Sequence, residues 1–340
     1  MRPPSQNEFT IAIICVLPLE GKAVEDLFDE TYDRLGEYYK KQPGDNNAYV
    51  YGRIGNHNVI LCYMPGMGNC SAASVALRLK ISYRRVKVAL VVGICGGAPY
   101  PLSGGEIFLG DVIISDSIVQ YNFGRQYPSG FEKKTDVKNT LRRPNQAIHA
   151  ILASLQARRS RSDFQERLSW HLKTLQESLP DWQRPTTVDD ILFEASYQHK
   201  SEDSYKAAVN STCIRLGCDL GRVCRRRPST ENRGPRVHIG TVASADMVMK
   251  SGEHRDRLVK SDGVIGFETG GVGVWDMISC IIIKGVCDYA DSHKTKAWQA
   301  YAAATGAATA KALLEYLPSN SVFTKDTQDE LFDINEYTVF

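Results

Sequence analysis

The sequence predicts a wound α/β domain in which buried strands alternate with helices. Apolar runs of strand length recur along the chain, and segments with helical spacing of apolar residues lie between them. The longest runs cover 11–17, 86–93 and 278–283, and none approaches the roughly eighteen residues of a membrane-spanning helix. The chain has 340 residues, 43% of them hydrophobic, so it can bury one large core.

The first half of the chain shows the alternation element by element. Pro18 opens a helix with acidic residues in its first turns. Gly55 and Asn56 separate two alternating segments, a pattern typical of a hairpin. A small-residue helix is expected over 71–79. The expected strands of this half cover 9–18, 49–54, 58–63, 86–99 and 110–121.

The middle of the chain, 131–235, has a different character and is interpreted as a helical and loop segment inserted into the domain. Apolar residues at helical spacing predict amphipathic helices at 148–155 and 164–179. Three consecutive arginines, 225–227, are interpreted as a solvated charge run.

The sheet pattern resumes after the middle segment, and an alanine-rich helix closes the domain. These later segments cover 236–244, 263–274, 278–291 and, for the helix, 298–317. The acidic tail, 319–340, is expected to be mobile or docked as an arm.

The charge pattern argues against several classes of partner. A net charge of +2 with 24% charged residues gives no basic face for nucleic acid. The polar first ten residues do not resemble a signal peptide, and no membrane association is expected. A cytoplasmic protein is therefore predicted.

The nine cysteines favour a reducing compartment, because several lie in apolar strand runs. Cys213, Cys218 and Cys224 lie near His199 and could act as zinc ligands. Their spacings match no compact pair of cysteines, which favours a loop that happens to hold thiols. No metal is expected.

Four segments place polar or flexible residues at the end of an apolar strand: 17–21, 93–98, 267–273 and 285–291. In open α/β sheets, ligands bind at the carboxyl ends of the strands. We therefore expect these segments to converge on a single cavity.

Seven blocks of sequence resemble the nucleoside phosphorylase/nucleosidase superfamily, in that family's order, and look most like its fungal branch. The blocks are AIICVLPLE, PGMGNCSAASVA, VVGICGGAP, GDVIISDSIVQYNFGRQYP, GTVASAD, FETGGVGVWD and KGVCDYADSHKTKAWQAYAAATGAATAKALLEYL. The match covers roughly 8–130 and 236–318, and the segment between also resembles that branch.

The resemblance implies a single domain over 8–318 with three α/β/α layers. The central mixed sheet would curl partly into a barrel flanked by helices, with 131–235 inserted within it. It also implies a homo-oligomer (dimer, trimer or hexamer), a small-molecule substrate such as a nucleoside or another planar ligand, and no metal or organic cofactor.

The resemblance also assigns two catalytic positions. Cleavage of a purine N-glycosidic bond passes through an oxocarbenium-like sugar and needs an acid for the leaving base. Asp288 matches the family's purine-facing aspartate, although an aspartate there could equally cap the following turn. Glu20 matches the glutamate that orients water in nucleosidases, although an acid in a first helical turn is common. LPLEGKA lacks the arginine with which hexameric phosphorylases bind phosphate, which favours hydrolysis.

The remaining expected site residues bind substrate. The GICGG run offers backbone N–H groups and little bulk, and two phenylalanines could form walls for a planar base. Where the family reads Glu-Met-Glu, this chain reads Glu268-Thr269-Gly270, so the carboxylate that grips the ribose diol is missing. Cys287 is interpreted as a buried structural thiol. The expected substrate-binding residues are Ile94, Cys95, Gly96, Gly97, Phe123, Phe267, Glu268, Thr269 and Gly270.

The sequence thus favours an enzyme that cleaves purine nucleosides at the N-glycosidic bond, by hydrolysis rather than phosphorolysis. Because Gly270 replaces the ribose-binding glutamate, two alternatives stay open. The scaffold could serve another reaction, such as tailoring of a secondary metabolite, or it could bind a ligand without catalysis.

Overall fold

The computed structural model describes residues 2–34, 36, 38–134, 146–200, 213, 216–231 and 233–317. The acidic tail predicted at 319–340 lies outside these residues. Nine strands form one sheet in the order β12-β11-β6-β13-β5-β1-β4-β3-β2. Its strands are β1 (Ile11–Cys15), β2 (Glu30–Asp33), β3 (Ala48–Ile54), β4 (His57–Tyr63), β5 (Val88–Gly97), β6 (Val112–Gln120), β11 (Val237–Ser244), β12 (Val264–Glu268) and β13 (Cys280–Asp288).

The sheet is mixed, and one end of it closes on itself. β5 runs parallel to β1 and β13, whereas β13 runs antiparallel to β6. β12 pairs with β11 in parallel and also with β5 in antiparallel, where Phe267 lies opposite Gly96. The strands β12, β11, β6, β13 and β5 therefore form a closed ring, and the predicted mixed, partly barrel-like sheet is confirmed.

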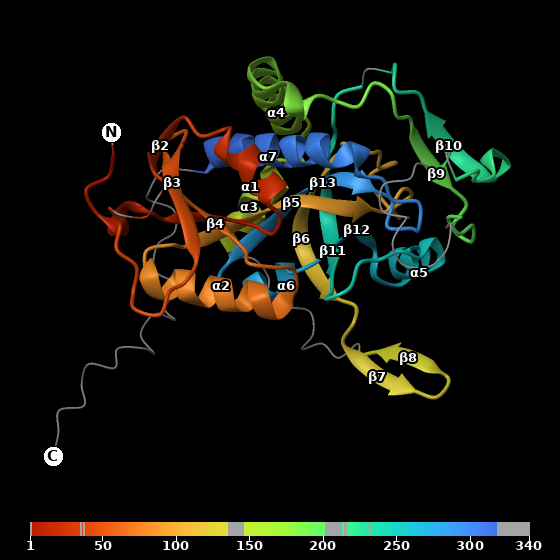
Figure 1. Cartoon of the computed structure of the whole chain (residues 1–340), viewed down its shortest axis with the longest axis horizontal. Helices are drawn as coiled ribbons and strands as arrows, with labels where there is room; N and C mark the ends of the chain where they lie inside the picture. Colours follow the sequence, from red (N-terminus) through yellow and green to blue (C-terminus); the bar gives the residue numbers. More distant parts are fainter. Residues whose placement is uncertain are drawn as a thin grey trace.

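Helices cover both faces of the sheet, so the molecule has three layers (Figure 1). α1, α4 and α7 lie on one side and α2 and α6 on the other. The helices are α1 (Pro18–Glu25), α2 (Asn69–Ser82), α3 (Gln146–Ser154), α4 (Arg158–Ser178), α5 (Gly252–Asp262), α6 (Gly271–Trp275) and α7 (Gln299–Tyr316). Single-turn 3₁₀ helices cover Gln6–Glu8, Pro180–Trp182, Leu220–Arg222 and Lys296–Trp298.

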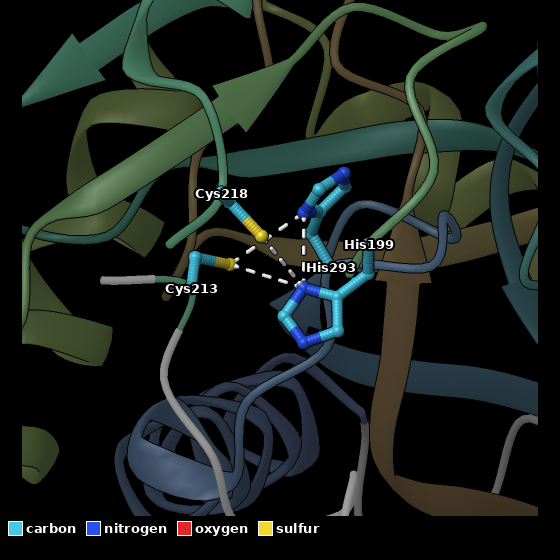
Figure 2. A group of neighbouring side chains, drawn as sticks. All are labelled: His199, Cys213, Cys218 and His293. Atoms are coloured by element: carbon cyan, nitrogen blue, oxygen red, sulfur yellow. Dashed lines mark hydrogen bonds between the residues drawn. The ribbon is translucent and has the colours of Figure 1, made fainter. Parts of the chain in front are cut away.

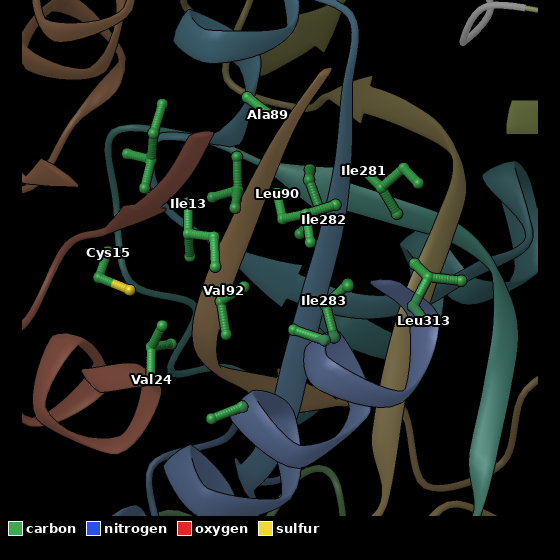
Figure 3. Close-up of a cluster of buried hydrophobic side chains, with 14 of the residues drawn as sticks. Ile13, Cys15, Val24, Ala89, Leu90, Val92, Ile281, Ile282, Ile283 and Leu313 are labelled. Carbon is green, nitrogen blue, oxygen red and sulfur yellow. The ribbon is translucent and has the colours of Figure 1, made fainter. Parts of the chain in front are cut away.

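The core lies where β1, β5 and β13 meet α1 and α7 (Figure 3). The central strands are buried on both faces, which explains why they read as continuous apolar runs instead of alternating ones. Ile13, Leu90 and Ile282 pack there with Val24 of α1 and Leu313 of α7. Each such side chain contributes about 1.5–3 kcal/mol on burial. This core fixes the strand ends that carry the site.

The middle of the chain packs on the outside of α7. The apolar face of α4 is buried, and the ring of Phe164 lies 5.6 Å from that of Tyr316. Arg167 and His171 of α4 reach Glu315 of α7 at 2.6 and 2.9 Å. The predicted amphipathic helices are therefore confirmed as α3 and α4, and α4 packs on the outer face of α7.

The expectation that the arginine run 225–227 is solvated was wrong. These residues belong to β10 (Val223–Arg227), which pairs with β9 (Asp190–Phe193). Arg227 is buried and reaches Asp190 at 3.1 Å, while the Arg225 guanidinium lies 4.0 Å from the ring centre of Phe108. The neighbouring strand supplies the counter-charge that the sequence run lacks, and only Arg226 has an exposed side chain.

Several elements were not predicted from the sequence, because their residues are mostly polar and half-exposed. They include β2 at the sheet edge, α5, and a hairpin of β7 (Gly124–Tyr127) and β8 (Gly130–Lys133) that projects from the body (Figure 1). The predicted hairpin around Gly55 is confirmed as β3 and β4. Among the described residues, no helix is both long and apolar enough to cross a membrane.

Candidate functional site

A cavity of about 190 Å³ opens where β1, β5, β12 and β13 end, at the point where the sequence predicted convergence. Most of the expected site residues lie on its wall. They are Glu20, Ile94, Cys95, Gly96, Phe267, Glu268, Thr269 and Asp288. Three other expected residues, Gly97, Phe123 and Gly270, do not line it.

Phe123 was a wrong choice for a cavity wall. Its side chain is 48% exposed, beyond the end of β6, where the chain leaves the sheet toward the projecting hairpin. Tyr121 takes the expected place: it is buried, and its ring meets Phe267 edge to face at 6.1 Å. The Tyr121 hydroxyl donates to the carbonyl of Met247 at 3.1 Å. The strand predicted at 110–121 ends at Tyr121. An aromatic residue at the end of a strand was the sequence signal for this wall.

Gly97 lies on β5, one residue past the cavity wall. A Cβ at Gly97 would meet Val286 at 2.7 Å and Ile107 at 3.2 Å, both inside the core. Gly97 therefore faces the core and not the cavity.

Backbone N–H groups from two segments, the residues after β1 and the end of β5, hold the carboxylate of Glu20. Its Oε2 accepts hydrogen bonds from the N–H groups of Val16 and Leu17, each at 2.8 Å, and its Oε1 accepts from Ile94 at 2.8 Å. A carboxylate has about four acceptor positions, so one remains for a ligand or water in the cavity. A Cβ at Gly93 would lie 2.1 Å from Oε1, so glycine is required for this arrangement. The structural and functional interpretations of Glu20 are therefore compatible.

Lys284 is a cavity residue that sequence reasoning missed. It lies inside β13 with only 2% exposure, and it lines the same cavity as Glu20 and Glu268. Burial disfavours its charge, but the carboxylates of Glu20 and Glu268 outweigh burial and raise the pKa of Lys284 above its usual value. A lysine within the apolar run CIIIKGVC was the available signal, because a buried lysine requires anionic partners.

Glu268 connects this charged group to the start of α6. Its carboxylate accepts from the N–H of Gly271 at 3.0 and 3.1 Å. Burial raises the pKa of Glu268, while Lys284, the Ser244 hydroxyl and the Gly271 N–H oppose that rise. Glu20, Lys284 and Glu268 thus form a charged end of the cavity, which we call the carboxylate–lysine group.

Asp288 lies at the other side of the cavity in a tight turn. Its Oδ1 accepts from the Ala290 N–H at 2.8 Å and from Lys294 Nζ at 2.5 Å. Ala290 has φ = 53°, a left-handed conformation that is uncommon for alanine and that this turn imposes next to the site. Burial disfavours the charge of Lys294, but Asp288 raises the pKa of Lys294 above its usual value. Asp288 therefore caps this turn, as one of its two interpretations predicted, and it also lines the cavity.

Cys287 precedes Asp288 and is buried, with Sγ 3.4 Å from the carbonyl oxygen of Cys95. Burial raises the pKa of the Cys287 thiol well above its usual value, so the group stays protonated. This agrees with a structural thiol.

Gly270 changes the backbone as well as the side chain. Its φ is +103°, a conformation that side-chain-bearing residues rarely adopt. A Cβ placed there would lie 3.7 Å from Ala72 and 3.8 Å from Met64, so it would face α2 and not the cavity. Restoring a glutamate at this position would therefore not restore a carboxylate in the cavity.

The cavity combines these groups with apolar walls. Phe267, Tyr121 and Met249 provide flat or flexible apolar surface, with Asp288 and the carboxylate–lysine group as polar contacts. Such a site can hold a planar ligand, exchange protons at Asp288 and stabilise positive charge near Glu20. Among the described residues, the group of His and Cys side chains close enough together to hold a metal ion, His199 among them, lies outside the cavity lining.

Comparisons with known proteins show the family and the fold of the chain. The sequence profile of the phosphorylase superfamily matches residues 10–317. A nucleotide-binding leucine-rich repeat (NLR)-like protein of Hyaloscypha variabilis is 31% identical over 324 residues, which cover 92% of this chain. The chain spans only 30% of that relative's length. A 5'-methylthioadenosine/S-adenosylhomocysteine nucleosidase of Mycobacterium bovis is 22% identical, with 91% of this chain and 97% of that protein covered.

Solved structures share the fold at lower identity. Futalosine hydrolase of Helicobacter pylori has a TM-score of 0.55 and 14% identity, covering 92% of this chain and 100% of that one. A 5'-methylthioadenosine/S-adenosylhomocysteine nucleosidase from Neisseria meningitidis, in complex with methylthio-immucillin-A, has a TM-score of 0.55 and 13% identity. That match covers 90% of this chain and 99% of the other.

Proposed function

The chain belongs to the phosphorylase superfamily, and from that premise we propose that its cavity hydrolyses the N-glycosidic bond of purine nucleosides. One observation carries the proposal: Asp288 and the carboxylate–lysine group line one cavity together with the aromatic walls Tyr121 and Phe267. The nucleoside-cleaving relative from Mycobacterium bovis and the analogue-bound nucleosidase from Neisseria meningitidis support it as analogy.

In this proposal Asp288 serves the leaving base. As the C–N bond breaks, its electron pair goes to the purine, and a proton or hydrogen bond at N7 stabilises the developing charge. Lys294 Nζ lies 2.5 Å from Asp288 Oδ1, so its positive charge would lie close to the base on which negative charge develops. The base would lie beside Phe267.

The carboxylate–lysine group serves the sugar and the water. The free acceptor position of Glu20 would bind the attacking water and take its proton as oxygen bonds to C1′. The negative charges of Glu20 and Glu268 would stabilise the oxocarbenium-like sugar. Lys284 would supply the positive charge that acts on both carboxylates in the buried site.

Water is favoured over phosphate as the nucleophile. None of the described residues that line the cavity is an arginine. The cavity's two lysines, Lys284 and Lys294, each lie beside carboxylates that already balance their charge. A dianionic phosphate would meet Glu20 and Glu268 without a spare cation.

The test is base release by the purified chain from adenosine, inosine, their 2′-deoxy forms and methylthioadenosine, with and without phosphate. We expect free base and free sugar without phosphate. Because no carboxylate grips the diol, we expect ribose and 2′-deoxyribose substrates to react at rates within about tenfold of each other, a difference of about 1.4 kcal/mol. Release only with phosphate, or from no substrate, would refute the proposal.

Binding without turnover, or another reaction on this scaffold, is the second candidate. The Lys294–Asp288 pair and the missing diol contact favour it, because both remove features that a nucleosidase uses. So does the NLR-like relative, of which this chain matches 30%. Calorimetry distinguishes the candidates: a nucleoside that binds but yields no base supports binding, and turnover of a non-nucleoside supports a changed reaction.

We also propose that the chain forms a homo-oligomer around the cavity mouth. Met67, Met247 and Val248 line the cavity, yet each is about half-exposed. An apolar rim of this kind favours a second copy as its cover. Light scattering should give a multiple of the 37.8 kDa chain mass, and Met247→Glu should shift the measured mass toward that of one chain.

We also propose a reducing, cytoplasmic location, with which nine unpaired cysteines are consistent.

A further inference from the structure

Four side chains outside the cavity point toward one another (Figure 2). They are His199, Cys213, Cys218 and His293, and their ligand atoms all lie within 4.8 Å of one another. We propose that these residues, called the His₂Cys₂ cluster below, bind one Zn²⁺ in a closed structural site.

The spacing of the ligand atoms fits a tetrahedron around zinc. Zn–N bonds of about 2.05 Å and Zn–S bonds of about 2.3 Å place two nitrogens about 3.3 Å apart, and nitrogen and sulfur about 3.5 Å apart. The two Nδ1 atoms of His199 and His293 lie 3.3 Å apart. Cys213 Sγ lies 3.5 Å from each Nδ1, and Cys218 Sγ lies 3.3 Å from that of His199. Four of the six edges therefore have about the lengths that a bound ion requires, and the other two are no longer than 4.8 Å.

The surroundings of His293 fix its ring for metal binding. Its Nε2 lies 3.1 Å from the carbonyl oxygen of Tyr197, which can only accept, so Nε2 carries the proton. With Nε2 bound to this carbonyl, Nδ1 is the ring nitrogen that faces the cluster and can bind the metal. The ring also stacks on Phe193, with centroids 4.0 Å apart. Histidine ligands of zinc are typically held in this way, by a hydrogen bond from the ring nitrogen that does not bind the metal.

The ligand set selects the metal and its role. Two thiolates and two imidazoles in tetrahedral array suit zinc, whereas magnesium and calcium prefer oxygen ligands. Four protein ligands leave no position for a substrate, which is typical of structural zinc. The site would therefore stabilise a fold and carry out no chemistry of its own.

The fold joins ligands from two distant parts of the chain. His199, Cys213 and Cys218 belong to the middle segment, whereas His293 follows β13, five residues after Asp288. The His199 N–H also donates to Ser292 Oγ at 2.9 Å. Zinc would tie the middle segment to the loop that carries Asp288. The sequence favoured a metal-free loop because its cysteines match no compact pair, and His293, 80 residues from Cys213, was not recognised as a fourth ligand.

The full chain, purified without chelator, should contain about one zinc per chain by plasma mass spectrometry. The double variant C213S/C218S should contain less than about a tenth of that. Cys224→Ser is the matched control, because Cys224 is an exposed cysteine of β10 outside the cluster, and it should keep its zinc.

Protein expressed in cobalt-supplemented medium provides a readout in case the double variant fails to fold. Four-coordinate cobalt bound by thiolates absorbs strongly in the visible range, and the wild-type chain and Cys224→Ser should both show this spectrum. A metal-free wild-type chain after incubation with zinc, an octahedral cobalt spectrum, or a Cys213–Cys218 disulfide in the intact chain would each overturn the proposal. Zinc without base release would leave it standing and count only against the nucleosidase.

Discussion

The cavity and the His₂Cys₂ cluster share one loop but are built differently. Asp288 ends β13 and faces the cavity, whereas His293 follows β13 and faces the cluster. Glu20 is fixed by neighbouring backbone groups at the ends of β1 and β5. The cluster instead needs the middle segment to fold against the loop after β13. Strand topology alone therefore locates the cavity, whereas the cluster depends on tertiary packing.

The largest expected effect is a loss of base release, which depends on the cavity and not on the His₂Cys₂ cluster. Asp288→Asn keeps the shape but removes the acid, so base release should fall by about 10²- to 10⁴-fold, while the zinc content stays at about one per chain. Chromatographic rates and metal analysis of one preparation measure both. Asp181→Asn, an exposed acid far from the cavity lining, is the control and should leave both unchanged. A parallel loss of zinc would mean that the two regions are not separable.

A stability measurement tests whether the buried carboxylates of Glu20 and Glu268 need the positive charge of Lys284. Lys284→Met leaves Glu20 and Glu268 buried without their cation, so urea unfolding should show a loss of about 3–5 kcal/mol. Lys80→Met, on the exposed face of α2, should change little. A loss under about 1 kcal/mol would contradict the carboxylate–lysine group as described.

The same difference between the two regions decides how much of each could be predicted from the sequence. The strands, their ends, Glu20 and Asp288 could be predicted because apolar runs mark buried strands and ligands bind at strand ends. Lys284 was missed because its partners, Glu20 on α1 and Glu268 on β12, are brought beside it only by the fold. Arg227 and His293 show the same limit, since Asp190 and the cluster cysteines are neighbours in space and not in sequence.

A smaller effect tests the positioning of Glu20. The Cβ of Gly93→Ala would lie 2.1 Å from Glu20 Oε1 and must displace it, at a cost of about 1–3 kcal/mol in unfolding free energy. Gly66→Ala, which meets nothing within 4 Å, is the matched control and should stay within about 0.5 kcal/mol. Equal stability of the two variants would show that Glu20 is not fixed as described.

The smallest expected effect is on the pH dependence of the unfolding free energy. Burial raises the pKa of Glu268, so above the usual glutamate pKa the folded chain holds a proton that the unfolded chain has lost. Folding stability contributed by this group therefore falls as pH rises from that value through the raised pKa, by at most about 1.4 kcal/mol per pH unit. Urea titrations of Glu268→Gln should show a flatter dependence than wild type above pH 4.5. An unchanged slope would assign the pH dependence to other groups.

The most direct test of the central claim is a crystal structure with a non-hydrolysable purine nucleoside analogue. The account predicts a purine beside Phe267, with N7 about 3 Å from the Asp288 carboxyl group and the sugar toward Glu20 and Lys284. An analogue bound elsewhere, or a cavity left empty at saturating concentration, would contradict it.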